Sequence, residues 1–211
     1  MRNHGGAIDG ALGITPSTTT ESNIAAIEAY CDPSNPEYDR KRARLIEASK
    51  TTDFEFHAPE IEIGWFYPSV DFEGQGKETR HDGQIMEDGT FDFTTYHPTS
   101  IPGHNLPHAW LQKGDETLST RDLMRDGKFV LITGAPGKWA GFANDLIDVE
   151  VIGKGGWLPT DARWSELCGI REDGAILVRP DGVVAWRAKK WKDEFEDSFS
   201  AIFDKVLGGK S

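Results

Sequence analysis

A short stretch between residues 57 and 67 combines residue types that can do chemistry. It holds one histidine, two carboxylates and three aromatic residues, at His57, Glu60, Glu62, Trp65, Phe66 and Tyr67. Strand alternation places Trp65 and Tyr67 on one face and Phe66 on the other. Aromatic walls with a phenol or an imidazole nearby suit an apolar small molecule. Tyr67 and His57 are therefore candidate catalytic groups, and Trp65, Phe66 and Tyr67 are candidate substrate-binding residues.

Three further candidates lie in a long excursion between residues 72 and 100. It holds Gly, Asp, His and Thr with isolated apolar residues, which is more typical of the border of a site than of a core. A histidine there can serve as an acid, a base or a hydrogen-bond donor near neutral pH. We expect His97 as a catalytic group, and Tyr96 and His81 as substrate-binding residues. A solvated loop position is the competing interpretation for each histidine.

Two histidines, His104 and His108, have the four-residue spacing of a helical metal site. Pro102 and Pro107 are incompatible with a regular helix there. We therefore expect both histidines to be structural, and no metal site is predicted. The sequence also shows no Ser-His-Asp order, no paired-carboxylate spacing and no phosphate loop.

The composition narrows the functional classes. The 211 residues include 35 acidic and 23 basic side chains, which gives a formal net charge of -12. We exclude nucleic acid as a partner because this surface repels a phosphate backbone. No membrane association is expected, since no run approaches the roughly 20 apolar residues of a span, and residues 1–13 lack the apolar run of a signal peptide. Cys31 and Cys168 form no C-x-x-C pair, so a reducing cytoplasm fits best.

The first part of the chain, residues 1–101, is expected to be an extension of helices and strands. Residues 1–20 are rich in Gly and Thr and predict a loose arm. A short helix is expected over residues 24–29, ended by the Pro-containing turn after it, and a surface helix over residues 37–50. Alternating apolar residues between 54 and 65 predict two short strands.

The second part, residues 102–211, has the element order of a thioredoxin-like layer. A hairpin leads to a turn capped by Ser119 or Thr120, followed by strands at FVLIT and IDVEV, with a helix capped by Thr160 after them. A second hairpin surrounds Pro180-Asp181-Gly182, with Arg179 and Arg187 expected to pair with acids, and a helix closes the chain. This order predicts an α/β fold with a central sheet covered by helices.

The same residues carry a resemblance to a known family. PGHNLPHAWL, TLSTRDL, FVLITG and GAILVRPDGVVAWR together resemble the C-terminal third of FAD-dependent aromatic hydroxylases of the phenol and chlorophenol hydroxylase type. The resemblance extends upstream through RKRARLIEASKTTDFEFHAPEIEIGWFYPSV and covers roughly residues 24–208, with Gly64 and Tyr67 at matching positions. It implies a thioredoxin-like last domain without the dithiol, used for packing and subunit contacts, with flavin and substrate held upstream.

The sequence departs from that family in what it lacks. No G-x-G-x-x-G opens a βαβ unit, and in the glycine-rich segment Gly153–Leu158 a leucine stands where the third glycine would be. Residues 135–139, Ala-Pro-Gly-Lys-Trp, occupy the place of the thioredoxin dithiol, so thiol–disulfide exchange is excluded. No cofactor is therefore predicted for this chain.

Three functional hypotheses remain open from the sequence. The first is a redox-neutral protein that binds an apolar metabolite at the aromatic residues, and as an enzyme would be a cyclase, isomerase or lyase. The second is a non-catalytic module, either a homodimer or a partner of a flavoprotein subunit. The third is a C-terminal fragment of a complete FAD-dependent aromatic hydroxylase.

Overall fold

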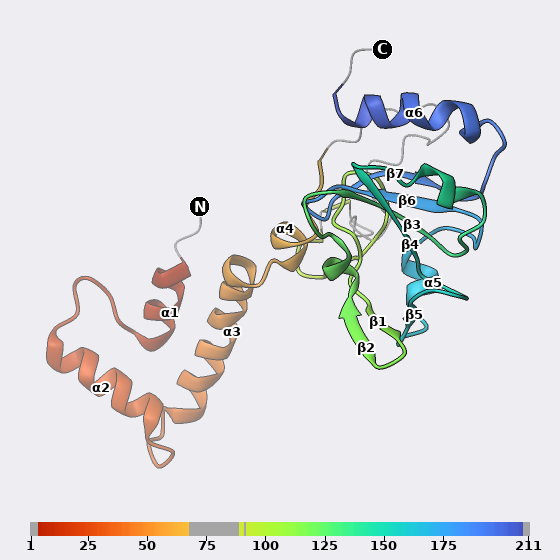
Figure 1. The fold of residues 1–211 in the computed structure, drawn as a ribbon. Helices are drawn as coiled ribbons and strands as arrows, with labels where there is room; N and C mark the ends of the chain where they lie inside the picture. Colours follow the sequence, from red (N-terminus) through yellow and green to blue (C-terminus); the bar gives the residue numbers. More distant parts are fainter. Residues whose placement is uncertain (1–3, 68–88, 91, 209–211) are drawn as a thin grey trace. The chain divides into compact units, whose positions relative to one another are not determined.

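In the computed structural model, which describes residues 4–67, 89–90 and 92–208, the chain forms two compact units. One unit comprises Met1–Pro59 with Phe93–Thr95, and the other comprises Glu60–Asp92 with Tyr96–Ser211. Figure 1 shows that the first unit is helical and that the second combines sheets with helices. Among the described residues, no helix has both the length and the apolar character that a bilayer crossing needs.

The helical unit contains α1 (His4–Leu12), α2 (Thr20–Cys31) and α3 (Tyr38–Phe56). Thr19 caps α2, because its hydroxyl accepts a hydrogen bond from the Ser22 N–H at 3.2 Å. Lys41 of α3 donates to the Leu12 carbonyl at 2.9 Å, which ties α3 to the free carbonyl end of α1. The predicted helices over 24–29 and 37–50 are therefore present and longer than expected.

Two predictions for the first part of the chain are wrong. Residues 4–12 form α1 where a loose arm was expected. The two short strands expected between 54 and 65 are also absent, since α3 continues to Phe56 and α4 (Pro59–Glu62) follows. A helix satisfies its backbone groups locally whereas a strand needs a partner, so the turns of α3 that precede residue 54 favour propagation through Phe56. Pro59 then suits the first position of a new helical turn.

The second unit is a thioredoxin-like α/β domain, as the sequence predicts. Its main sheet has the order β4-β3-β6-β7, formed by β3 (Phe129–Thr133), β4 (Ile147–Val151), β6 (Ala175–Val178) and β7 (Val184–Ala188). Strands β3 and β4 are parallel, and the β6–β7 hairpin joins antiparallel to β3. Figure 1 shows α6 (Phe195–Val206) along one face of this sheet and the smaller sheet with α5 (Trp164–Leu167) on the other.

Alternation along the central strands builds two separate cores. Leu131 and Leu177 point to the face that α6 covers, where they pack with Trp186 and Phe199. The neighbouring residues of the same strands point to the opposite face, against the smaller sheet and α5: Val130, Ile132, Ile176 and Val178. Both faces of β3 and β6 are thus buried, which explains their continuous apolar sequences.

A tryptophan fills the place where a thioredoxin keeps its dithiol. After β3, the short 3-10 helix η3 (Lys138–Phe142) carries Trp139, which is 1% exposed. Its ring lies 4.6 Å from that of Trp191 and 6.0 Å from that of Trp186, centroid to centroid. Its indole N–H donates to the Asp173 carbonyl at 2.8 Å. This position therefore serves packing.

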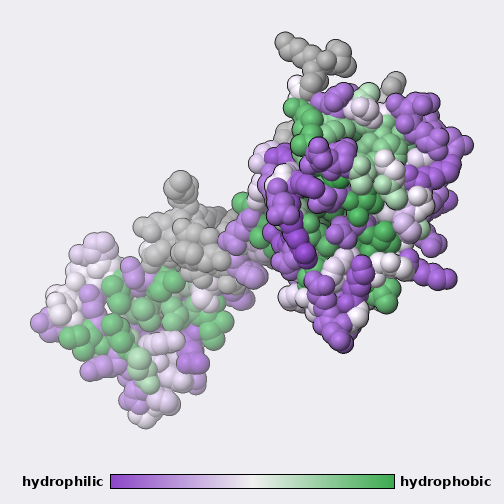
Figure 2. Space-filling model, in the orientation of Figure 1, coloured by the Kyte–Doolittle hydropathy of each residue, from purple (hydrophilic) through white to green (hydrophobic). Residues whose placement is uncertain are grey.

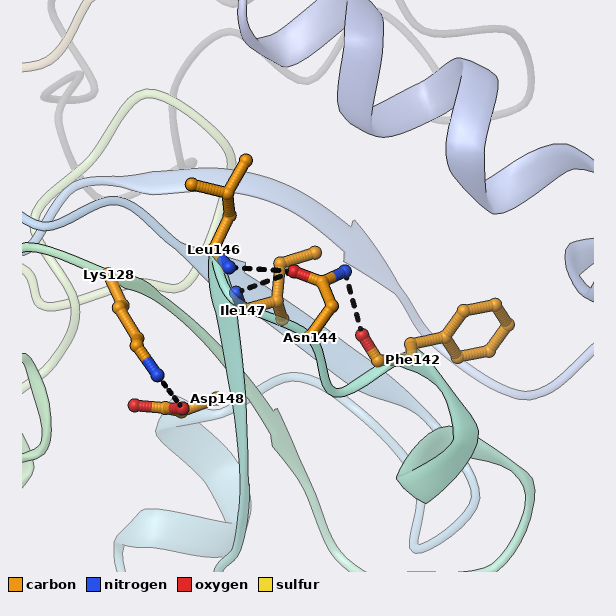
Figure 3. A network of polar contacts seen from close by, with 6 residues as sticks. All are labelled: Lys128, Phe142, Asn144, Leu146, Ile147 and Asp148. Carbon is orange, nitrogen blue, oxygen red and sulfur yellow. Dashed lines mark hydrogen bonds and ion pairs between the residues drawn. The ribbon is translucent and has the colours of Figure 1, made fainter.

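The entry into β4 is fixed by one amide side chain (Figure 3). Asn144 Oδ1 accepts hydrogen bonds from the backbone N–H groups of Leu146 at 2.8 Å and Ile147 at 3.0 Å. Asn144 Nδ2 donates to the Phe142 carbonyl at 3.3 Å. These bonds close the turn between η3 and β4 and set the register of β4 against β3.

The smaller sheet has the order β2-β1-β5, with β1 (Trp110–Lys113), β2 (Glu116–Ser119) and β5 (Leu158–Pro159). The predicted hairpin is present, and Ser119 is the N-cap of η2 (Thr120–Leu123). The prediction that Thr160 caps α5 is wrong. Arg163 occupies the N-cap of α5, and the Thr160 hydroxyl instead donates to the Trp110 carbonyl at 3.3 Å.

Replacing Trp139 with alanine should destabilise the domain far more than replacing Trp110. Trp139 is 1% exposed and Trp110 is 54% exposed, so only the first substitution empties a packed core. We expect Trp139→Ala to lower the free energy of unfolding by about 3–5 kcal/mol and Trp110→Ala by less than about 1 kcal/mol. Urea titrations with matched m-values measure both, and equal losses would show that the aromatic cluster does not stabilise the fold.

Candidate functional site

Residues 103–106 extend the main sheet beyond the edge of β7. The N–H of Gly103 donates to the Val184 carbonyl at 2.8 Å, and the N–H of Val184 donates to the His104 carbonyl at 2.9 Å. The N–H of Leu106 donates to the Gly182 carbonyl at 2.9 Å. The start of β7 is therefore paired on this side and offers no free edge there.

Residues 63–67 dock onto this added segment. Phe66 pairs antiparallel with His104, and the N–H of Tyr67 donates to the Gly103 carbonyl at 2.9 Å. The Asn105 side-chain amide donates to the Ile63 carbonyl at 3.0 Å. A Cβ atom on Gly103 would lie 2.2 Å from the Tyr67 carbonyl oxygen, and Gly103 has a φ of +94°. Only glycine allows the two backbones to approach this closely.

The docked segment turns its aromatic rings to two sides, as strand alternation predicts. Phe66 is half-buried and stacks on His104, with ring centroids 4.6 Å apart and planes 14° apart. His104 is 3% exposed, and its Nδ1 lies 3.2 Å from the Ile101 carbonyl oxygen. On the other side, Trp65 and Tyr67 meet edge to face at 5.0 Å. Phe66 thus anchors the segment, and Trp65 and Tyr67 present its outer side.

The β6–β7 hairpin places a cation over the outer aromatic pair. The Arg179 guanidinium carbon lies 5.1 Å from the Tyr67 ring centroid. The same guanidinium donates to Asp181 Oδ2 at 2.5 Å, which confirms the predicted pairing of Arg179 with an acid. A cation over an aromatic face is attractive, so Arg179 restrains the ring of Tyr67.

Four large apolar residues of α4 and of the docked segment are exposed, and we call them the junction strip. It consists of four residues that are 41–56% exposed: Ile61, Ile63, Trp65 and Tyr67. Several large exposed apolar side chains within one short segment of a charged protein are typical of surfaces that contact a partner. The strip therefore has the character of a docking surface.

A buried carboxylate fixes the base of the strip. Glu60 of α4 is 1% exposed, and its Oε2 accepts a hydrogen bond from the backbone N–H of His97 at 2.8 Å. The Nδ1 atom of His97 lies 3.7 Å from the same oxygen. A Cβ on Gly64 would come within 2.5 Å of this carboxylate, so Gly64 lets the chain pass over it. Glu60 thus joins two segments that are 37 residues apart in the sequence.

The charge of this carboxylate acts on Tyr96, whose phenol is held in its protonated form. Burial raises the pKa of the Tyr96 phenol, the positive charge of Arg121 works in the opposite direction, and the charge of Glu60 raises the pKa further. At neutral pH the phenol is therefore a hydrogen-bond donor and not a base.

The structure brings some of the predicted site residues together and not others. Trp65, Phe66 and Tyr67 share one docked segment, and His97 and Tyr96 lie beside Glu60 in the same unit. His57 belongs to the helical unit and is exposed. His81 lies outside the described residues. The catalytic roles given to His97, Tyr67 and His57, and the substrate-binding roles given to the others, stay predictions.

The glycine-rich segment after β4 does not fit a dinucleotide. The N–H of Gly153 donates to the Trp157 carbonyl, the N–H of Gly156 to the Gly153 carbonyl, and the N–H of Trp157 to the Val151 carbonyl. A Cβ on Gly156 would lie 2.2 Å from the Val151 carbonyl oxygen. These three N–H groups are occupied within the fold and are not available to a pyrophosphate. Within the described part of the chain, no group of three His, Cys, Asp or Glu side chains is placed to hold a metal ion.

Three contacts that build the site cannot be read from the sequence pattern. The pattern around residues 57–67 includes Glu60 but does not indicate its anchoring role, and Gly64, four residues later, is the only local signal of it. The contact of Gly103 with Tyr67 joins positions 36 apart in the sequence and leaves no local pattern. Arg179 was expected to pair with an acid, but its contact with Tyr67 was not foreseen.

Comparisons with known proteins give this site a context. The family model described as "Aromatic-ring hydroxylase, C-terminal" matches residues 99–208. Phenol 2-monooxygenase of Pseudomonas sp. (strain EST1001) is 35% identical over 208 residues, covering 94% of this chain and 32% of the relative. 2,4-Dichlorophenol 6-monooxygenase of Delftia acidovorans is 30% identical, covering 93% of this chain and 34% of the relative.

A solved structure agrees with these sequence matches. The flavin-dependent monooxygenase PieE, in complex with FAD and substrate, superposes with a TM-score of 0.74 and 30% identity. The superposition covers 97% of this chain and 35% of PieE. This chain therefore spans about a third of the length of the relatives it matches.

Replacing Gly103 with alanine should cost more stability than the same change at Gly114. Both glycines have positive φ, but an added Cβ meets the Tyr67 carbonyl only at Gly103 and nothing within 4 Å at Gly114. We expect Gly103→Ala to lower the free energy of unfolding by about 1–2 kcal/mol more than Gly114→Ala. Chemical denaturation of both variants tests this, and equal costs would mean that the close approach of Tyr67 is not required.

Stability should fall at alkaline pH because of Tyr96. Its folded pKa is raised above the ordinary tyrosine value of 10.0, so its contribution is full below that pH and is lost as pH rises through the folded pKa. In tyrosinate absorbance at 295 nm, the difference between wild type and Tyr96→Phe should show a midpoint above pH 10.0. A midpoint at or below that value would show that this phenol is solvated.

Proposed function

Because the chain belongs to the aromatic-ring hydroxylase family through its C-terminal domain, we propose that it serves as the C-terminal module of a flavin-dependent aromatic hydroxylase. In this proposal the junction strip docks on the part of the enzyme that carries flavin and substrate. The observation that carries the proposal is the exposed Trp65–Tyr67 pair, held in place by backbone contacts in a chain that matches about a third of the length of these enzymes.

The chain covers about a third of its relatives, which supports separate roles for this module and for the part of the enzyme outside the match. About two thirds of the length of phenol 2-monooxygenase lies outside the match, which leaves ample chain to hold the cofactor and the substrate. Three N–H groups of the glycine-rich segment bond within the fold of this chain. The module would then contribute packing and orientation, and the hydroxylation chemistry would lie in the flavin-bearing part.

The physical state of the junction strip supports docking. Covering a half-exposed isoleucine, tryptophan or tyrosine would contribute about 1 kcal/mol for each side chain. The strip is also restrained before it binds, since Glu60 holds its base and Arg179 holds Tyr67. A restrained surface loses less conformational freedom on association than a flexible one. A rigid apolar strip is therefore well suited to a permanent contact.

A redox-neutral activity on an apolar metabolite is the second candidate. It is favoured by the aromatic pair with a cation beside it and by the protonated phenol of Tyr96. A ligand on the strip would, however, remain partly in water, because Trp65 is 41% exposed and Tyr67 is 44% exposed. Calorimetric titration with phenolic and polycyclic aromatic compounds tests this candidate, and it predicts binding that Trp65→Ala abolishes.

Homodimer formation and a cytoplasmic location remain predictions alongside these functions. Cys31 and Cys168 are both free thiols in the structure, in keeping with a reducing compartment. The genomic sequence upstream of the Met1 codon decides whether the flavin-bearing part is encoded in the same reading frame or as a separate subunit.

A charge on the strip should abolish docking. The probe is the FAD-loaded part of the Pseudomonas phenol 2-monooxygenase that lies outside its match with this chain, used as a preparation that retains its flavin. We expect Trp65→Glu to weaken the complex at least tenfold, or about 1.4 kcal/mol, because the carboxylate would be buried against an apolar surface. Flavin absorbance in co-elution and titration experiments measures the complex.

The matched control is Trp110→Glu, which places the same charge at a tryptophan that is 54% exposed on the smaller sheet. It should change the affinity less than twofold. The proposal fails if the wild-type chain and the FAD-loaded part do not associate, or if the two variants weaken the complex equally.

A further inference from the structure

The described side chains of the helical unit form almost no core. Among its described side chains, residues 6–50, 57–59 and 93–95, only Ala29 is buried. Helices α1 and α2 have 9 and 12 residues, lengths at which an isolated helix is marginal in water. Helices of this size normally gain stability by burying an apolar face. Over the side chains that the structure describes, the contacts inside this unit therefore provide little of the burial that would stabilise its helices.

Helix α2 is apolar on two opposite sides. One side carries Ala26, Ala29 and Tyr30, which are buried or half-buried at helical spacing. The other carries Ile24, Ile27 and Cys31, at spacings of three and four, and all three are exposed. We call these three residues the α2 stripe. Figure 2 shows apolar side chains gathered over the helical unit. A helix that is apolar on both sides is typical of one packed between two neighbours.

We infer that the α2 stripe is a second docking surface for the flavin-bearing part of an aromatic hydroxylase, and that the helical unit becomes stably ordered only when it is covered. This inference rests on the proposed function and extends it to a surface distinct from the junction strip. The match with phenol 2-monooxygenase covers 94% of this chain, so it includes most of the helical unit, and about two thirds of that enzyme remains outside the match. We take this remaining part of the enzyme as the partner that covers the α2 stripe.

Folding coupled to docking follows from the same observations. Ordering a segment at the moment of binding costs conformational entropy, which the newly buried apolar surface offsets. The second unit, by contrast, has two filled cores on the faces of its main sheet. The two units should therefore differ sharply in local stability when the chain is alone.

The reactivity of the Cys31 thiol shows whether the α2 stripe is covered. It is exposed on the stripe, whereas Cys168 is 6% exposed in the core of the second unit. We expect the Cys31 thiol of the full chain to react with a maleimide as a free thiol does, and to react at least tenfold more slowly when the FAD-loaded probe is bound. Cys168 should stay unreactive in both states, which confirms that the second unit remains folded.

Hydrogen exchange on the same samples tests the ordering. Peptides from α2 should exchange rapidly in the chain alone and become protected in the complex, while peptides from β3 and β6 should be protected throughout. As a matched pair, Ile27→Glu should weaken the complex at least tenfold and Ala25→Glu, on the same helix away from the stripe, less than twofold.

The outcomes separate this inference from the proposed function. Complex formation with no slowing at Cys31, or α2 peptides already protected in the chain alone, would overturn the inference and leave the proposed function standing. Slowing at Cys31 as the concentration of the chain alone rises would identify a second copy as the occupant and would also overturn it. Absence of any complex would overturn both.

Discussion

The close approach of two backbones at Gly103 and Tyr67 is the constraint on which the candidate site depends. Residues 63–67 are hydrogen-bonded to residues 103–105, and these in turn are hydrogen-bonded to the start of β7. A side chain at position 103 would occupy the space of the Tyr67 carbonyl. Because this ladder fixes the direction of each successive side chain, it buries Phe66 against His104 and leaves Trp65 and Tyr67 outside. The exposed aromatic pair is therefore a consequence of the fold.

In this thioredoxin-like domain, the position that holds the dithiol in a thioredoxin is used for core packing. Trp139 fills the space after β3 and contacts the rings of Trp191 and Trp186. The surfaces with functional character lie elsewhere, on the junction strip and on α2. The same sheet topology thus supports a different role, because function resides in the residues placed on a fold and not in the fold itself.

The sequence predicted the second unit well and the first unit poorly, for physical reasons. Strands such as β3 and β6 are continuous apolar runs whose only stable place is inside a two-faced sheet. Between 54 and 65 the alternation is too short to separate a strand from a helix, and α3 simply continued. Glycines at positions 5, 6 and 10 have low helix propensity, so the sequence does not predict α1. Contacts such as Glu60 with His97, far apart in the sequence, leave no periodic signal.

The account holds that the junction strip is an interface with the flavin-bearing part of a hydroxylase. The most direct measurement is the exposed fraction of Trp65 in an experimental structure of the chain bound to that part. Trp65 is 41% exposed in the chain alone, and the account predicts that it becomes buried in the complex, together with Tyr67. A complex in which Trp65 keeps its present exposure, with the flavin-bearing part seated on another surface, would contradict the account.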